Sequence, residues 1–295
     1  MTVKTISTPL RLGDATRRKV FNLFVTALMG LFALTMITPF LWMLSASLKL
    51  PLDVMKLPIE WIPKYWYPDN YLQVWNIGDV APVDYHFGLA YFNSLKIAFI
   101  NLAGSVTTST LAGYAFAKIK FRGSTAVFFF YLATMMIPSQ VTLIPRFIIF
   151  RNLGFTGTHL TLILPGLITI TGTFLMRQYF LQVPNELRES AFIDGASEIR
   201  IWAQIMVPVA KPNMAALAMM VFLWNWNNYQ DALVFLTNWR LYTIPIALTN
   251  FIEESVTEYN LVMAASASAL IPVFAVFIFG QRFFVKGLVA GAVKG

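Results

Sequence analysis

The sequence predicts an all-α membrane protein with about six transmembrane helices. Only 12% of the 295 residues are charged, about half the share that soluble domains carry, whereas 57% are hydrophobic and the mean hydropathy is +0.63. Several apolar runs reach the length of about 20 residues that a helix needs to cross the ~30 Å hydrocarbon core of a bilayer. Lipid is therefore the expected solvent for most of the chain.

The apolar runs follow one another along the chain, with polar loops between them. The six expected spans are Phe21–Ser45, Phe92–Ala117, Thr125–Ile144, Leu160–Phe180, Asn213–Val234 and Leu261–Phe284. Pro138, Pro165 and Pro272 lie inside spans. We expect kinks or breaks there, because proline removes a helical hydrogen bond and membrane helices tolerate the loss.

Basic residues gather on one side of this arrangement. Fifteen of the 22 Lys and Arg residues lie in the N-terminal tail, in the loops after the second and fourth spans, and at the C-terminus. Cytoplasmic loops carry such an excess, so both termini are expected in the cytoplasm. The net charge of +8 is then explained by topology, and no nucleic-acid partner is expected.

Two segments on the opposite side are expected to remain outside the spans. The loop Lys49–Phe87 is rich in Trp, Tyr and Pro, which suits an aromatic belt at the membrane interface. A surface that meets an external partner is the alternative for this loop. Pro145–Thr158 is too polar to span and is interrupted by Gly154 and Gly157, so we expect it to lie along the membrane surface.

Catalytic and metal-binding motifs are missing from the sequence. It contains neither a phosphate-binding loop nor a His-Glu-x-x-His pair, and both histidines, His86 and His159, fall near predicted span ends. Acidic residues are nearly absent from the spans, Asp231 being the closest, whereas ion-coupled carriers usually need ionisable groups within the membrane. We therefore expect no catalytic, cofactor or metal site, and we expect the energy for uphill transport to come from another subunit.

The segment between the fourth and fifth spans is polar, and residues 184–203 are expected to form a cytoplasmic helix. Pro184 suits its first position, and Glu186 and Glu189 suit its first turns. Small residues would let another protein approach closely; they are Ser190, Ala191, Gly195 and Ala196. A helix resting on lipid headgroups is the alternative, although its balanced charges match anionic lipid poorly.

A specific motif lies in this segment. Glu189-Ser190-Ala191-x-x-x-Gly195, followed after nine residues by Ile205-x-Val207-Pro208, resembles the EAA signature of permease subunits in binding-protein-dependent ABC importers. It departs from the signature at Ser190, which replaces the second alanine, and at Val207, which replaces leucine. Both replacements belong to the same size class as the residue they replace. Further runs resemble the sugar-importing branch, typified by the smaller permease of the maltose transporter; they are Asn93-Ser94, Asp194-Gly195-Ala196-Ser197, Lys211-Pro212 and the tail from Gln281 to Gly295.

The resemblance implies a type I importer core at about residues 88–282, within a six-span permease domain of residues 20–286. Residues 1–19 and 287–295 would be cytoplasmic tails, the second one extended. The segment 184–203 would be a coupling helix that Pro208 and Pro212 turn back to the membrane. The implied coupling residues are Glu186, Glu189, Ser190, Ala191, Asp194, Gly195, Ala196, Ser197 and Pro208, with Gly291, Lys294 and Gly295 as a C-terminal ATPase contact.

The resemblance also implies the partners and the activity. They are a homologous second permease, two cytoplasmic ATPase subunits that hold ATP and Mg, and an extracytoplasmic solute-binding protein, all at a bacterial cytoplasmic membrane. This chain would translocate a sugar or oligosaccharide without catalysing a reaction. Glu189 would anchor the coupling helix, and Gly195 would permit close approach. An ion-coupled secondary transporter is the alternative, and a membrane-embedded enzyme has almost no support.

A polar, aromatic run at the end of the fifth span is the best candidate for a substrate path. Buried amides in lipid need partners, so the run 224–230 should face a cavity or another subunit. The expected path residues are Gln140, Trp224, Asn225, Asn228 and Tyr229. The run could instead mark the membrane interface or pack on the second permease. Neutral oligosaccharides, acidic sugars and glycerol phosphate are all compatible with the sequence.

Overall fold

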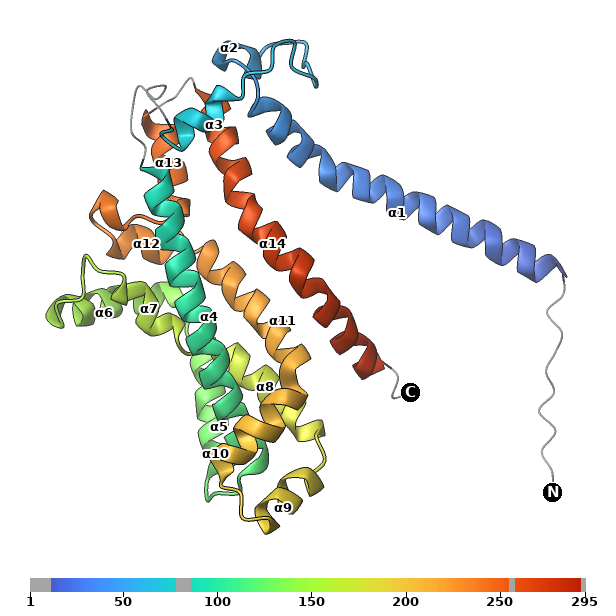
Figure 1. Cartoon of the computed structure of the whole chain (residues 1–295), viewed down its shortest axis with the longest axis vertical. Helices are drawn as coiled ribbons and strands as arrows, with labels where there is room; N and C mark the ends of the chain where they lie inside the picture. The colour runs from blue at the N-terminus through green and yellow to red at the C-terminus, as the bar shows by residue number, and fades with distance from the viewer. Residues whose placement is uncertain (1–11, 78–85, 255–257, 293–295) are drawn as a thin grey trace.

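The computed structural model describes residues 12–77, 86–254 and 258–292, and these residues form helices and no strand. The all-α prediction is confirmed. Figure 1 shows α4, α11 and α14 as the long elements of the body, with α1 extending away from it. The helices at one end, α2, α3 and α13, lie far from α9 at the other end.

The helices are short or long according to where prolines, glycines and polar residues interrupt the apolar runs. They are α1 (Leu12–Ala46), α2 (Pro51–Val54), α3 (Asp69–Val74), α4 (Phe87–Lys118), α5 (Ser124–Ala133), the 3-10 turn η1 (Thr134–Met136), α6 (Ser139–Asn152), α7 (Leu160–Gly166), α8 (Ile170–Gln182), α9 (Glu186–Ile193), α10 (Glu198–Ile201), the π-helical turn η2 (Trp202–Met206), α11 (Val207–Trp226), α12 (Gln230–Phe235), the 3-10 turn η3 (Trp239–Leu241), α13 (Ile244–Glu254) and α14 (Tyr259–Ala292).

Four helical segments are long and apolar enough to cross a membrane. They are Thr16–Ala46, Leu160–Gln182, Glu198–Trp226 and Tyr259–Arg282, and they contain the expected first, fourth, fifth and sixth spans, apart from residues 227–234 of the fifth and the last two residues of the sixth. The expected second span lies in α4, which has 32 residues but is more polar. Asn93, Asn101 and Ser105 are among the polar side chains that α4 buries inside the body. This helix lies at the centre of the bundle, where it packs against α8 and α11.

The expected third span is broken in two. α5 and η1 end at Met136, α6 begins at Ser139, and the two parts are bent by 98°. Pro138 causes the break, because a residue before proline disfavours the helical region, and Ile137 accordingly has the extended angles φ −83° and ψ 115°. α6 then runs sideways from the body and includes the first half of the segment expected at the membrane surface (Figure 1).

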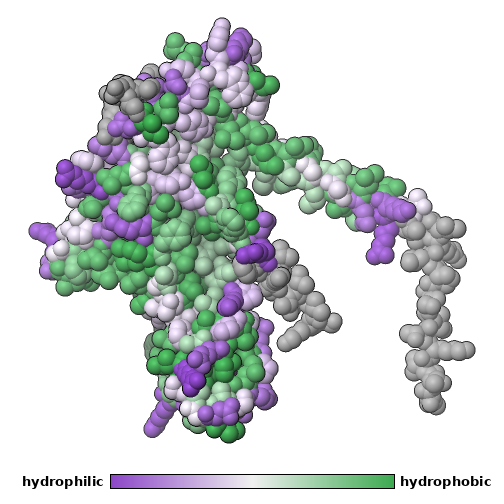
Figure 2. Space-filling model, in the orientation of Figure 1, coloured by the Kyte–Doolittle hydropathy of each residue, from purple (hydrophilic) through white to green (hydrophobic). Residues whose placement is uncertain are grey.

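The helix α1 contacts α14 but leaves most of its length uncovered by the other described residues. None of its most apolar stretch is buried, and phenylalanine side chains such as Phe21, Phe24 and Phe32 are exposed. In Figure 2 its surface is largely hydrophobic, with hydrophilic residues gathered toward its N-terminal end. A helix that is apolar on all sides belongs in lipid or against another membrane helix.

The core of the body lies around α4, which packs against α8 and α11, and α11 packs in turn against α14. One buried cluster joins Tyr114, Met176 and Phe180 near the α9 end. A second joins Phe87, Phe222 and aromatic residues of the other end. Both ends of α4 and α11 are thus packed in buried clusters.

Candidate functional site

The segment between α8 and α11 differs from the single helix expected at residues 184–203. It folds as α9, a turn, and α10, and α10 continues through η2 into α11. Pro184 lies two residues before the first residue of α9 instead of inside its first turn. The expected continuous helix is therefore wrong, and the turn between its two halves needs a physical cause.

Gly195 provides that cause. Its φ of +80° lies in the left-handed region that favours glycine, and it follows directly on the last turn of α9. The Ala196 N–H donates to the Ala191 carbonyl at 3.0 Å, and the Gly195 N–H donates to the Phe192 carbonyl at 3.1 Å. This pattern is a Schellman motif, which ends a helix and satisfies its last carbonyls. Gly195 is thus a C-terminal cap of α9 and not the mid-helix glycine that the sequence suggested.

Pro208 and Pro212 were expected to turn the chain back to the membrane, but in the structure they do not. Pro208 is the second residue of α11, and Pro212 lies inside that helix. A proline inside a helix lacks an N–H and crowds the carbonyl four residues before it. The π-helical turn η2 precedes Pro208 and widens the helix at this place, so the chain stays helical from Glu198 to Trp226. The reversal takes place at Gly195 instead.

A polar cluster fixes α9 to the body. The Tyr114 hydroxyl of α4 donates to Glu198 Oε2 at 2.5 Å, and Arg188 Nε donates to the same oxygen at 3.2 Å. A second guanidinium nitrogen of Arg188 pairs with Glu198 Oε1. Hydrogen bonding to Glu198 raises the pKa of Arg188 above its ordinary value, so this cation stays charged. One carboxylate thereby joins α9, α10 and α4.

The start of α9 is fixed in a similar way. Lys118, the last residue of α4, is buried, and its ammonium donates to Asn185 Oδ1 at 2.7 Å and to the Val183 carbonyl. Sequence reasoning did not find Lys118, Arg188 or Glu198 as partners. Lys118 and Glu198 contact residues 67 and 84 positions away, and Arg188 of α9 pairs with Glu198 of α10. Contacts between separate elements leave no periodic pattern in the sequence.

The end of the molecule at α9 carries an exposed, mixed surface, which we call the tip surface. Its apolar members are Phe192, Ile193 and Ile199, with exposed fractions of 59%, 84% and 71%. Its polar members, also exposed, are Glu186, Glu189, Ser190, Asp194 and Ser197. Clustered exposed apolar side chains with a polar rim mark interaction sites. The tip surface is therefore the best candidate for a surface on which a partner docks at the α9 end of the molecule.

The other expected coupling residues lie around the tip surface in different settings. Ala191 is buried at 9% exposure and packs in the cluster of Tyr114 and Phe180, so it supports α9 from inside. Ala196 is half-buried, and Pro208 is exposed one helix farther along. Gly291 is in the last turn of α14, which contradicts the extended tail expected from residue 287, while Lys294 and Gly295 lie outside the described residues.

The expected substrate path is only partly brought together. α11 ends at Trp226, so the expected fifth span is broken before Val234, and Asn227–Tyr229 separate it from α12. A polar pocket of about 190 Å³ opens beside this break. It is lined by Ser105, Gly166, Ile168, Thr169, Val221, Trp224, Asn225 and Asn228. Three of the five expected path residues therefore share one cavity, which we call the polar pocket.

The remaining path residues lie elsewhere. Gln140 is exposed at the start of α6, and Tyr229 precedes α12 without lining the polar pocket. Sequence reasoning missed Asn101, a fully buried residue of α4. Its Nδ2 donates to Asn225 Oδ1 at 2.5 Å and to the Leu162 carbonyl at 3.2 Å. Asn101 thereby fixes the orientation of one amide of the pocket.

An ion pair adjoins the polar pocket. Arg146 of α6 pairs with Asp231 of α12, and both side chains are about one-quarter exposed. Asn228 Nδ2 donates to Asp231 Oδ2 at 3.3 Å, and the Asp231 N–H donates to Asn228 Oδ1 at 3.2 Å. The pair therefore connects the broken third span to the break after α11. Sequence analysis singled out Asp231 but not its partner.

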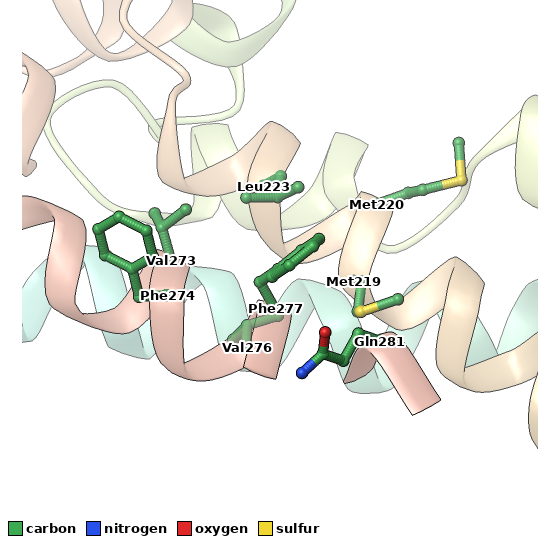
Figure 3. Close-up of a pocket in the computed structure, with 8 residues that line it drawn as sticks. All are labelled: Met219, Met220, Leu223, Val273, Phe274, Val276, Phe277 and Gln281. Carbon is green, nitrogen blue, oxygen red and sulfur yellow. The ribbon is translucent and has the colours of Figure 1, made fainter. Parts of the chain in front are cut away.

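A larger groove between α11 and α14 has the opposite character. Its volume is about 660 Å³, and its lining residues are Met219, Met220, Leu223, Val273, Phe274, Val276, Phe277 and Gln281. Figure 3 shows Phe277 of α14 directed toward α11, with Gln281 the one polar side chain drawn. Such a lining suits lipid or another apolar helix and offers a hydroxylated substrate few hydrogen bonds.

Known proteins resemble this chain over nearly its whole length. The arabinooligosaccharides transport system permease protein AraQ of Bacillus subtilis (strain 168) is 30% identical over 278 residues, covering 94% of this chain and 97% of AraQ. The sn-glycerol-3-phosphate transport system permease protein UgpE of Yersinia enterocolitica is 35% identical over 239 residues, covering 80% of this chain and 85% of UgpE.

The fold agrees with a solved structure. A chain in the crystal structure of a bacterial ABC transporter involved in the import of the acidic polysaccharide alginate superposes with a TM-score of 0.80 at 24% identity, covering 94% of this chain and all of the other. The family model of the binding-protein-dependent transport system inner membrane component matches residues 106–289. The chain is therefore a multi-pass membrane protein that belongs to this family of ABC importer permeases.

Proposed function

We propose that this chain is one transmembrane subunit of an ATP-driven importer that carries a sugar or oligosaccharide across a bacterial cytoplasmic membrane. Its family membership supports the importer assignment, and the names of AraQ and UgpE support a sugar or sugar-related cargo. The six-span domain is residues 20–286, with its core at about 88–282. Both termini are cytoplasmic, as the distribution of basic residues suggests.

The tip surface couples this chain to an ATPase subunit. The observation that carries this step is the Gly195 turn, which presents Phe192 and Ile193 at the end of a short, fixed helix. Exposed apolar side chains of this kind suit a cleft in a partner, and Glu189 beside them suits a basic group at its rim. ATP and Mg are held by two ATPase subunits, and this chain performs no hydrolysis itself.

The cluster around Glu198 transmits the motion. Arg188 and Tyr114 hold the carboxylate from α9 and from α4, and α10 continues directly into α11. A pull on the tip surface therefore acts on the two central helices together. When the ATPase subunits close on ATP, this chain and its homologous second permease would change which side of the membrane the path faces.

The remaining assignments follow from the same scheme. Gly291, Lys294 and Gly295 form a second ATPase contact at the C-terminus, and an extracytoplasmic solute-binding protein delivers the cargo. The substrate path includes Trp224, Asn225 and Asn228 in the polar pocket, with Gln140 and Tyr229 nearby in the assembled transporter. An ion-coupled carrier that works without an ATPase is the alternative, and the pairing of Asp231 with Arg146 leaves it without a free carboxylate at this position.

The Ile193→Glu variant tests the coupling step. Ile193 is 84% exposed, so the substitution leaves the packing of the body intact while placing a charge on the apolar part of the tip surface. We expect the complex with the ATPase subunits to weaken, and uptake driven by ATP to fall at least about tenfold, which corresponds to 1.4 kcal/mol. Co-purification of the ATPase subunits and uptake into proteoliposomes are the measurements.

A matched control comes from the opposite end of the molecule. Ile62 is also largely exposed, at 75%, and lies in the loop between α2 and α3. The Ile62→Glu variant should retain its ATPase subunits and its uptake. Full uptake by Ile193→Glu, or uptake that requires an ion gradient and no ATP, would refute the coupling role.

A further inference from the structure

We propose that Arg177 and the basic loop between α4 and α5 bind the headgroup of an anionic phospholipid at the membrane boundary near α9. This site lies apart from the polar pocket and the tip surface, and it does not involve the transported molecule. The inference goes beyond the proposed function, since it requires only that the chain spans a membrane. Three features carry it: the hydrogen bonds that Arg177 lacks, its aromatic support, and the basic and apolar side chains beside it.

Arg177 lies toward the α9 end of an apolar segment. It belongs to α8, which forms the second half of the candidate span Leu160–Gln182. At 1.5 Å per residue, its Cα is about 7–8 Å from the end of that helix at Gln182. A long basic side chain near the end of a membrane helix extends toward the headgroups. Arg177 is therefore expected at the depth of the lipid phosphates.

The chain itself satisfies little of the Arg177 guanidinium. Its Nε donates to the Phe116 carbonyl of α4 at 3.4 Å, and this is its one hydrogen bond among the described residues. None of the ion pairs in that part of the chain includes Arg177, and Glu198 at this end is held by Arg188. The two terminal nitrogens carry four more N–H groups, and the described residues do not enclose them. These donors form a planar pair that suits a phosphate.

An aromatic cluster holds the guanidinium in place. Its carbon lies 4.1 Å from the centre of the Phe128 ring of α5. Phe128 is buried, and the rings of Phe116 and Phe174 pack on it at centroid distances of 5.3 and 6.5 Å. A guanidinium stacked on an aromatic face is already ordered before an anion arrives. The free donors of Arg177 are thus oriented by three helices, α4, α5 and α8.

Further basic side chains adjoin this cluster. The loop between α4 and α5 carries Lys120 and Arg122, which are both exposed and form no ion pair within the described ranges. Phe121 of the same loop packs on Phe116, with 6.0 Å between the ring centroids, so the loop lies beside Arg177. Basic sites between membrane helices bind anionic lipid headgroups. The three cations therefore favour an anionic ligand over a zwitterionic one.

The apolar surroundings favour a lipid over a soluble anion. α5 and α8 contact each other close to α4 (Figure 1). α5 begins the broken span, so its outward side chains are expected at the depth of the acyl chains. Free phosphate would pair with the cations and leave these side chains uncovered, whereas a phospholipid covers both parts. The exposed apolar residues of α5 and α8 that acyl chains would cover are Val127, Phe129, Phe130 and Leu175.

Photolabelling of the assembled transporter in phosphatidylcholine vesicles tests the site. The probes are phosphatidylglycerol and phosphatidylcholine that carry the same diazirine-bearing acyl chain, and peptide mass spectrometry locates the label. Residues 24–44 of α1 contain no charged side chain and serve as the internal reference. Label in α5 and α8 relative to this reference should be at least about threefold higher for phosphatidylglycerol, since a charge-assisted hydrogen bond contributes at least this much. Equal ratios for the two lipids would overturn the inference.

Charge-removing variants test the named residues. Arg177→Gln should abolish the preference for phosphatidylglycerol, because it removes the cation and its planar pair of donors. Arg122→Gln changes an exposed loop residue without disturbing the packing, and it should reduce the preference. Arg200→Gln removes a charge from an exposed position of α10 at the same end and should retain it. An undiminished preference in Arg177→Gln, or an equal loss in Arg200→Gln, would overturn the inference.

A free anion and a protein partner give different results. If an excess of inorganic phosphate abolished the preference, the ligand would be a soluble anion and the lipid assignment would fail. Because the chain contains no cysteine, Val127→Cys places a single thiol on the exposed side of α5. A short photocrosslinker attached to this thiol should form lipid adducts. Cross-links to another subunit in their place would overturn the inference in favour of a protein partner.

Discussion

A single backbone angle at Gly195 shapes the tip surface, which is the proposed docking site for an ATPase subunit. Its φ of +80° costs other L-residues about 1–2 kcal/mol, and a Cβ added there would meet no other atom within 4 Å. We therefore predict that Gly195→Asn retains most uptake, because asparagine tolerates this conformation, whereas Gly195→Val loses it. A strain of this size changes the population of the native turn roughly 5–30-fold.

The same pair of variants separates two roles for Gly195. If the partner needed a small residue for close approach, asparagine would be as harmful as valine, since the two side chains are similar in size. If the turn conformation is the requirement, only valine disrupts it. Uptake and ATPase activity of the reconstituted transporter are the measurements, with membrane insertion checked for both variants. Equal loss in both variants would refute the conformational role.

Gly195 and the residues that form long-range contacts show why the sequence predicted the site incompletely. The small residues around Gly195 suggested a smooth helix face, because composition does not reveal a positive φ. The contacts of Asn101 with Asn225 and of Tyr114 with Glu198 join residues 124 and 84 positions apart, and neither pair belongs to a local motif. By contrast, the run of residues 224–230 is recognisable from the sequence alone as unusual, because amides are rare in apolar spans.

At the scale of elements, uninterrupted apolarity was predictable and interruptions were less so. α1 and α14 follow directly from their long apolar runs, whose length matches the bilayer. Pro138 predicted a kink or break in the third span, and the structure has a break with a 98° bend. Pro208 suggested a turn, yet the π-helical turn η2 before it accommodates the proline within a continuous helix. Whether proline breaks or only distorts a helix depends on the neighbours that satisfy the backbone, which the local sequence does not specify.

The contact between α4 and α7 supports a prediction at this scale. A Cβ added at Gly166 would lie 2.0 Å from Asn101 Nδ2, so the close approach of the two helices at this point requires glycine. Gly166→Ala should displace α7 and weaken the hydrogen bonds of Asn101, at a cost of about 1–3 kcal/mol for overpacking. A lower thermal unfolding temperature in detergent and reduced uptake are the expected outcomes.

The partner substitution provides the control for this contact. Asn101→Ala removes the side chain that a new Cβ would strike. In the double variant Gly166→Ala/Asn101→Ala, the unfolding temperature should therefore exceed the value expected from adding the two single effects, since contacting residues couple. Simple additivity of the two changes would mean that the close approach of α4 and α7 does not limit stability.

At the scale of the whole molecule, the chain has two polar ends separated by apolar helices. One end carries the aromatic loop with α2 and α3, and the other carries α9 (Figures 1 and 2). The basic residues near α9 predict that this end is cytoplasmic. In intact spheroplasts, a membrane-impermeant thiol reagent should therefore modify the Ile62→Cys variant and leave the Ile193→Cys variant unmodified.

Permeabilised cells supply the complementary measurement. Both side chains are largely exposed, at 75% and 84%, so both thiols should react once the reagent enters the cytoplasm. Overexpression of the ATPase subunits should then slow the reaction of Ile193→Cys alone, because the tip surface becomes covered. Reaction of Ile193→Cys from outside would reverse the orientation and place the proposed docking surface where no nucleotide-hydrolysing partner can reach it.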